Sequence, residues 1–144
     1  MPEDQTSYAT PRNLFWSQIR RGSPGIRAAI ESAGIDLRAL VFYLAHGEHE
    51  SRYTVVPADL TGAKCGVEVL NDDFTAMEFV VNILTRCFGM VRADAIRFML
   101  DTHRAGSAVL PQDSVARATQ SVLAVNAEAR QHYYPLLCRV VALH

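Results

Sequence analysis

Apolar and polar positions divide the chain into a weakly patterned first third and a strongly patterned remainder. Alternation over Val67–Asn71 predicts a strand, and apolar residues at helical spacing predict helices over Thr75–Phe88, Arg92–Arg104 and Val115–Ala129. Short apolar runs at 108–110 and 135–141 predict two more strands. The order β-α-α-β-α-β predicts an α+β domain, a two-layer sandwich with helices over one sheet face. The expected inward positions of the second helix are Ile96, Met99 and Leu100. The apolar residues that the third helix runs through are Val115, Ala118, Val122, Leu123, Val125 and Ala129.

The first third is expected to form a small helical extension. A short helical stripe around residues 10–19 is followed by a predicted helix over Ile26–Ala33 that stops at Gly34. Asp36 is expected to cap a further helix that ends near Gly47. We therefore divide the chain into a helical N-terminal extension (1–50), a linker (51–65) with one possible extended piece at 53–56, and the patterned domain (66–144).

Composition narrows the possible functions. The 144 residues include 14 basic and 15 acidic side chains, so the basic excess that nucleic-acid binding needs is missing. No apolar run approaches the ~18 residues of a membrane span, and the acidic, polar N-terminus is unlike a signal peptide. Three cysteines without C-x-x-C spacing agree with a reduced protein. We expect a cytoplasmic protein that binds neither nucleic acid nor a membrane.

Two adjacent carboxylates, Asp72 and Asp73, stand between the first predicted strand and helix, where a core has little use for them. Thr75 can cap the helix that follows, and His103 near the end of the next helix is a possible partner. Acceptors grouped in this way are suited to holding a cation.

Three separated motifs resemble the ClpS family, adaptors of the ATP-dependent Clp protease. They are VEVLNDDFTAMEFVVNIL (67–84), IRFMLDTHRAG (96–106) and HYYPLLCRV (132–140), in matching order and spacing over residues 66 to 141. The resemblance implies a non-enzymatic adaptor that recognises the free α-amino group and bulky hydrophobic first residue (Leu, Phe, Tyr or Trp) of N-degron substrates. It would deliver them to a Clp AAA+ unfoldase by docking on the N-terminal domain of that unfoldase. No cofactor or metal is implied.

The resemblance also implies roles for individual residues. Asn71, Asp72 and His103 would bind the amine, and Asp73 would hold the peptide backbone next to it. An apolar pocket for the first side chain would be lined by Thr75, Met77, Met99, Thr102 and Leu136, with Met77 as the gatekeeper against β-branched residues.

The chain departs from the family in three places. Thr102 stands where valine is common, which predicts a more polar pocket rim. The stretch 110–121, which corresponds to the unfoldase-docking surface, lacks the usual Cys-Gly pair and has Ser121 in place of a lysine. The helical extension replaces a short flexible tail. Residues 25–45 faintly resemble a fragment of a Clp unfoldase N-terminal domain, although a generic helical hairpin explains them about as well. If the resemblance holds, the extension would imitate or occlude the docking contact.

Each of these site residues also has a simpler structural interpretation. The two acids can be helix-start residues, His103 a helix-end histidine, Asn71 a turn residue, and Met77, Met99 and Leu136 ordinary core. His46–Glu50 (HGEHE) invites a metal interpretation but does not have the H-E-x-x-H spacing. The alternative function is a diverged ClpS-like module that regulates the unfoldase or another partner without delivering substrates. An enzyme that uses the acid–histidine cluster is the third option, and no nucleophile accompanies that cluster.

Overall fold

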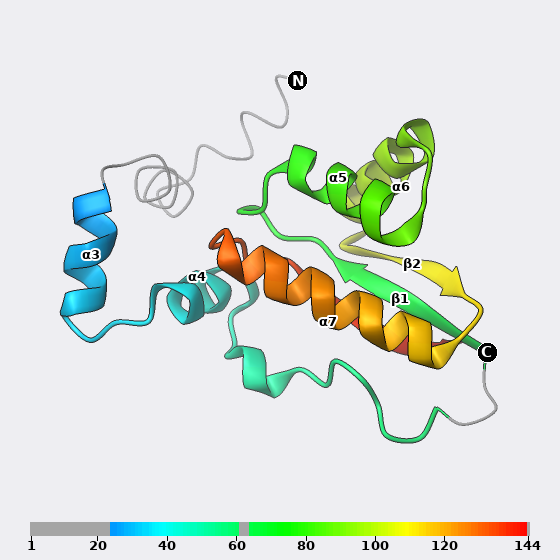
Figure 1. The fold of residues 1–144 in the computed structure, drawn as a ribbon, viewed down its shortest axis with the longest axis horizontal. Coiled ribbons are helices and arrows are strands. Elements are labelled where there is room, and N and C mark those ends of the chain that lie inside the picture. Colours follow the sequence, from blue (N-terminus) through cyan, green and yellow to red (C-terminus); the bar gives the residue numbers. More distant parts are fainter. Residues whose placement is uncertain (1–23, 61–63, 144) are drawn as a thin grey trace.

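The computed structural model describes residues 24–60 and 64–143, arranged as one three-stranded sheet with helices packed on it (Figure 1). The helix expected around residues 10–19 lies outside the described residues. From β1 onward the order is β-α-α-β-α-β, which confirms the predicted α+β architecture. The elements are α3 (Pro24–Ser32), α4 (Leu37–His46), η1 (Glu50–Arg52), β1 (Lys64–Leu70), α5 (Met77–Phe88), α6 (Arg92–Ala105), β2 (Ser107–Gln112), α7 (Val115–Gln131) and β3 (Leu137–Leu143).

The sheet is antiparallel, with strand order β2-β1-β3. Alternation along β1 sends Cys65, Val67 and Val69 toward the helices. Glu68 points to the opposite face, where its carboxylate accepts hydrogen bonds from Arg139 Nε of β3 (2.6 Å) and Ser107 Oγ of β2 (3.2 Å). A charged residue in the central strand is therefore tied to both neighbouring strands.

The helices form the second layer on one face of the sheet. α7 packs along β1 and β3, α6 contacts β2, and α5 lies against α6 and α7. One predicted inward position is wrong, because Ile96 is 37% exposed. Leu123, which belongs to the apolar pattern of the third helix, is 54% exposed. The core that the two layers enclose includes Val67, Val69, Val80, Val81, Ile83, Leu84, Val122, Val125, Cys138 and Val140.

The extension contains the two expected helices. Asp36 caps α4 as predicted, because its carboxylate accepts hydrogen bonds from the amides of Arg38 (3.1 Å) and Ala39 (3.3 Å). Gly47 ends α4 with φ +75°, a left-handed conformation that glycine adopts without steric strain. In Figure 1, α4 lies beside the C-terminal end of α7.

The residues between the extension and β1 are more than a polar connection. Residues 53–56 form no strand, yet the carbonyl oxygen of Val55 accepts a hydrogen bond of 2.8 Å from the amide of Val140 on β3. Leu60 is 6% exposed and belongs to the core. This part of the predicted linker therefore covers the outer edge of β3 and completes the core.

Three predicted boundaries need correction. β1 ends at Leu70, so Asn71 lies just beyond the strand. β2 continues through Pro111 to Gln112. The cap residue of α5 is Ala76 rather than Thr75, because the Thr75 side chain is used elsewhere.

Candidate functional site

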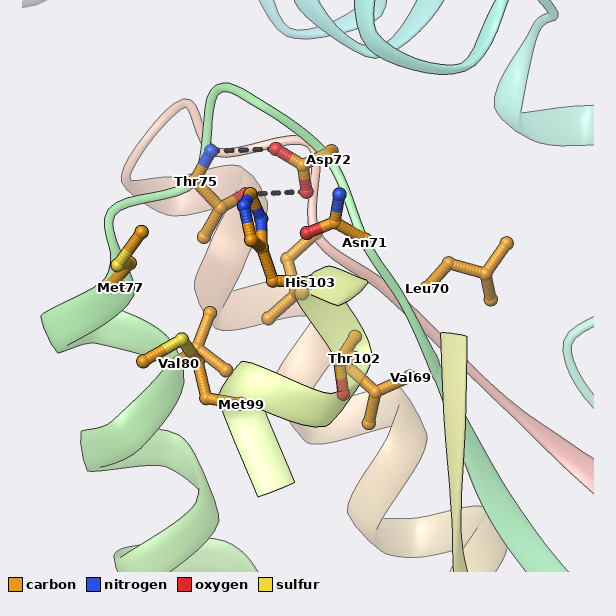
Figure 2. A pocket seen from close by; sticks show the side chains of 11 residues that line it. Val69, Leu70, Asn71, Asp72, Thr75, Met77, Val80, Met99, Thr102 and His103 are labelled. Atoms are coloured by element: carbon orange, nitrogen blue, oxygen red, sulfur yellow. Dashed lines mark hydrogen bonds between the residues drawn. The ribbon is translucent and has the colours of Figure 1, made fainter. Parts of the chain in front are cut away.

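A pocket opens where β1 ends, between the first turn of α5, the last turns of α6 and the residue before β3 (Figure 2). It is a narrow hollow with a cavity volume of about 20 Å³, and it is partly open to solvent. Eight of the nine residues predicted for the site line it, and Asp73 does not. The lining residues are Val69, Leu70, Asn71, Asp72, Thr75, Met77, Val80, Met99, Thr102, His103 and Leu136.

One side of the pocket is apolar. Met77 and Val80 are neighbours on α5 at i and i+3, and Met99 reaches the same space from α6. Leu136, which is 2% exposed, lines the pocket from the segment leading into β3. Methionine side chains adapt their shape to a ligand, so this wall can accept side chains of different outlines.

The other side is polar and is shaped by Asp72. Its Oδ1 accepts hydrogen bonds from the amides of Phe74 (2.8 Å) and Thr75 (2.6 Å), and its Oδ2 accepts one from Thr75 Oγ1 (2.8 Å). These bonds fold residues 72–75 into a tight loop. A carboxylate accepts about four hydrogen bonds, so Asp72 can shape the loop and still accept from a ligand.

Burial makes Asp72 electrostatically unusual. Desolvation raises the pKa of its carboxyl group above the ordinary value, more strongly than the opposing effects lower it. Those opposing effects are the hydrogen bonds from Thr75 and Phe74 and the charge of His46 on α4. A buried carboxylate at a pocket wall gains much from a cationic ligand.

The two threonines at the pocket differ from what the sequence predicted. Thr75 is 5% exposed and bonds to Asp72 instead of capping α5. Thr102 is 4% exposed, and its Oγ1 donates a hydrogen bond of 2.9 Å to the carbonyl oxygen of Phe98 one turn earlier in α6. Because that hydroxyl is satisfied within its own helix, Thr102 adds less polarity to the pocket rim than its residue type indicates.

His103 and Asn71 complete the polar side. His103 lies in the last turn of α6 and is half-buried, and Figure 2 shows it between the methionines and the pair Asn71 and Asp72. Asp73 is exposed. Its predicted contact with a peptide backbone beyond the pocket stays a prediction.

Sequence reasoning missed Val69, Leu70 and Val80 as lining residues. Val80 had a usable signal, because it follows Met77 by one helical turn. Val69 and Leu70 of β1 had no such signal in the sequence. Strand alternation assigns Val69 to the core.

No metal centre forms among the residues that the structure describes, since none of their His, Cys, Asp and Glu side chains gather in groups of three or more that could hold an ion. In the HGEHE segment, His46 Nε2 lies 2.8 Å from the carbonyl oxygen of Pro135. Within the same described ranges, every helix is too short or too polar to cross a membrane.

The stretch that corresponds to the docking surface lies away from the pocket. Pro111, Gln112 and Asp113 join β2 to α7, and together with Arg117 and Ser121 they border a second, open hollow beside Cys87 and Phe88. The described contacts of α4 are at the other end of α7. That the extension imitates or occludes the docking contact stays a prediction.

Comparison with known proteins supports the motif-based resemblance. The family model described as ATP-dependent Clp protease adaptor protein ClpS matches residues 63–139. The ClpS adapter protein of Hydrogenovibrio crunogenus is 46% identical over 74 residues, which are 51% of this chain and 71% of that protein. Its counterpart from Aromatoleum aromaticum is 47% identical over 75 residues, or 50% of this chain and 71% of that protein.

A solved structure agrees at the level of the fold. Agrobacterium tumefaciens ClpS2, solved bound to L-phenylalaninamide, superimposes with a TM-score of 0.50 and 26% sequence identity, covering 56% of this chain and 98% of that one. The matched family model and relatives are described as adaptors of the ATP-dependent Clp protease. With the fold, the pocket and the sequence matches in agreement, the chain belongs to the ClpS family of Clp protease adaptors.

Proposed function

We propose that this chain recognises the free α-amino group and the bulky hydrophobic first residue of N-degron substrates and delivers them to a Clp AAA+ unfoldase. The observation that supports this most directly is a single pocket with an apolar wall and a polar rim that contains a buried carboxylate. An amino acid at the start of a chain has the matching pair of features, a cation and a side chain on one carbon.

The polar rim suits an ammonium group. The α-amino group has a reference pKa near 8 and is mostly charged at neutral pH. In the proposal, Asp72 and the amide oxygen of Asn71 accept from it on one side and His103 on the other. A blocked amine leaves these acceptors unpaired, which costs binding free energy.

The apolar wall suits a large first side chain. In the proposal, Leu, Phe, Tyr or Trp packs against Met77, Met99 and Leu136. A β-branched residue widens close to its Cα atom, where Met77 would obstruct it. The Agrobacterium protein was solved with a ligand that has a free amine and an aromatic side chain, which supports the same mode of binding here.

Substitution of His103 tests the proposal. A fluorescent peptide that begins with Phe is titrated against the full chain and against His103→Ala, with binding followed by fluorescence polarisation. Loss of one acceptor for a charged donor is expected to weaken binding about tenfold or more. His49→Ala serves as the control, because His49 is exposed and does not line the pocket. Equal affinity in all three proteins would contradict the assigned site.

A second candidate is a diverged module that binds the unfoldase or another partner without delivering substrates. Ser121, in place of the family's lysine, and the Pro111–Gln112 pair favour it, because both belong to the stretch that corresponds to the docking surface. This candidate predicts partner binding without amine-dependent peptide binding, so the same titration separates the two.

A further inference from the structure

Phe74 connects the pocket to the N-terminal extension. Its neighbours Asp72 and Thr75 line the pocket, but the Phe74 side chain does not. It is 8% exposed and forms a separate apolar cluster with Leu37 (0% exposed) and Val41 (2% exposed) of α4. The amide of the same residue donates to Asp72 Oδ1. The backbone of Phe74 therefore belongs to the Asp72 loop, while its side chain is held by the extension.

Polar contacts fix α4 in this position. Arg38 Nε donates a hydrogen bond of 2.8 Å to the carbonyl oxygen of Arg130, and the Arg38 guanidinium lies 4.3 Å from the centroid of the Tyr133 ring. At the other end of α4, His46 Nε2 lies 2.8 Å from the carbonyl oxygen of Pro135. The helix is thus attached at one end to the last turn of α7 and to Tyr133, and at the other end to Pro135 in the segment that joins α7 to β3.

A second path from α4 reaches the apolar wall. The Arg130 guanidinium lies over the Phe42 ring at 4.8 Å and donates a hydrogen bond of 2.7 Å to the carbonyl oxygen of Leu136. Leu136 lines the pocket. The extension is therefore in contact with the supports of both the polar loop and the apolar wall.

We propose that α4 is a positioning element that holds the 72–75 loop in its binding-competent shape through Phe74. The inference rests on the proposed function, because it concerns how tightly the same pocket binds a free amine. If the loop 72–75 moves freely, the apparent affinity of the pocket for a ligand falls with the fraction of time that the loop spends outside its binding-competent shape. Packing of Phe74 against α4 lowers that fraction in the free protein, before a ligand binds.

The test weakens the α4 contact without touching the pocket. Leu37→Ala and Val41→Ala are combined in the full chain, and Tyr43→Ala is the matched control, since Tyr43 is on the same helix and is 51% exposed. Two quantities are measured: the dissociation constant for a peptide that begins with Phe, and hydrogen exchange at the amides of Phe74 and Thr75. We expect about tenfold weaker binding and at least about tenfold faster exchange at both amides, because large-to-small changes in a buried cluster remove most of its packing. The control is expected to match the wild type.

Two results would overturn the inference: unchanged exchange at Phe74 and Thr75, or faster exchange with unchanged peptide affinity. Faster exchange at core amides such as Val67 and Val140 would indicate general unfolding, and Val41→Ala alone is then measured in the same way. If the wild type fails to bind the free-amine peptide, the proposed function fails, and exchange at the two loop amides still decides whether α4 holds the loop.

Discussion

At the scale of single residues, Asp72 links the stability of the chain to its proposed activity. Burial raises the pKa of this carboxyl group, so the folded chain binds its proton more tightly than the unfolded chain does. The free energy of unfolding therefore falls as pH rises from the ordinary aspartate pKa through the raised one. At neutral pH the ionised side chain is a cost to folding, and a bound cation would offset it.

Asp72→Asn separates the charge from the shape of the loop. The amide oxygen can still accept from the Phe74 and Thr75 amides, and Thr75 Oγ1 can accept from the new NH₂ group. We expect the variant to melt at the same temperature as the wild type or higher at pH 7, with the difference shrinking toward pH 4. Binding of a free-amine peptide is expected to fall about ten- to a hundredfold. Thermal melts over pH and peptide titrations measure both effects, and wild-type affinity would show that Asp72 serves the loop alone.

The Thr102→Val variant tests whether threonine, in place of the family's common valine, affects binding at the pocket rim. Because the Thr102 hydroxyl is satisfied by the Phe98 carbonyl oxygen, its replacement by a methyl group removes little from the pocket. We expect the ranking of peptides that begin with Leu, Phe, Tyr or Trp to stay the same, with each affinity within about twofold of wild type. Met77→Ala is the positive control and is expected to alter the ranking. A Thr102→Val variant with a changed ranking would mean that the hydroxyl contacts the ligand.

At the scale of elements, the pattern of the chain predicted the helices and strands well where each has a buried stripe. The glycines that end α4, α5 and α6 (Gly47, Gly89 and Gly106) adopt positive φ values, and Gly47 was expected from the sequence as a helix end. Thr75 was misassigned because a neighbouring carboxylate competes for its hydroxyl, a choice that depends on the folded loop. Ile96 and Leu123 are apolar residues outside the buried stripes, and residue type alone could not separate them from core positions.

The residues of the pocket could be predicted from the sequence only in part. The resemblance carried the pocket residues of the loop after β1, of α5 and of α6, because their motifs are local in sequence. The contact between Phe74 and α4 joins residues more than thirty positions apart, and α4 lies outside the stretch 66–141 that the ClpS resemblance covers. Neither Leu37 nor Val41 is distinguishable, in sequence, from any other buried helical residue. Isolated Leu60 gave no periodic signal either, although it is buried in the core.

At the scale of the whole molecule, the pocket and the stretch that corresponds to the docking surface occupy different places. α4 lies beside the C-terminal end of α7, whereas the Pro111–Ser121 stretch lies at the N-terminal end of α7. Under the proposed function, such an arrangement would let the chain hold a substrate and a protease component at once. Changes at the docking stretch are therefore expected to leave the pocket unaffected.

Ser121→Lys tests whether the altered docking stretch weakens contact with the unfoldase. Restoring the family's lysine is expected to raise affinity for the N-terminal domain of a Clp unfoldase about threefold, the effect of one surface charge pair. Gln120→Lys adds the same charge at an exposed neighbouring position and is the matched control. Isothermal titration calorimetry measures both, and an equal gain in the two variants would show a general effect of charge without a specific contact.

The central claim is that the pocket binds a free α-amino group together with a large first side chain. The most direct measurement compares two peptides that begin with Phe and differ by acetylation of the amine, each titrated against the full chain by fluorescence polarisation. Acetylation removes the charge and leaves buried acceptors unpaired, so the account predicts a loss of affinity of about a hundredfold or more. Affinities within about twofold of each other would contradict it.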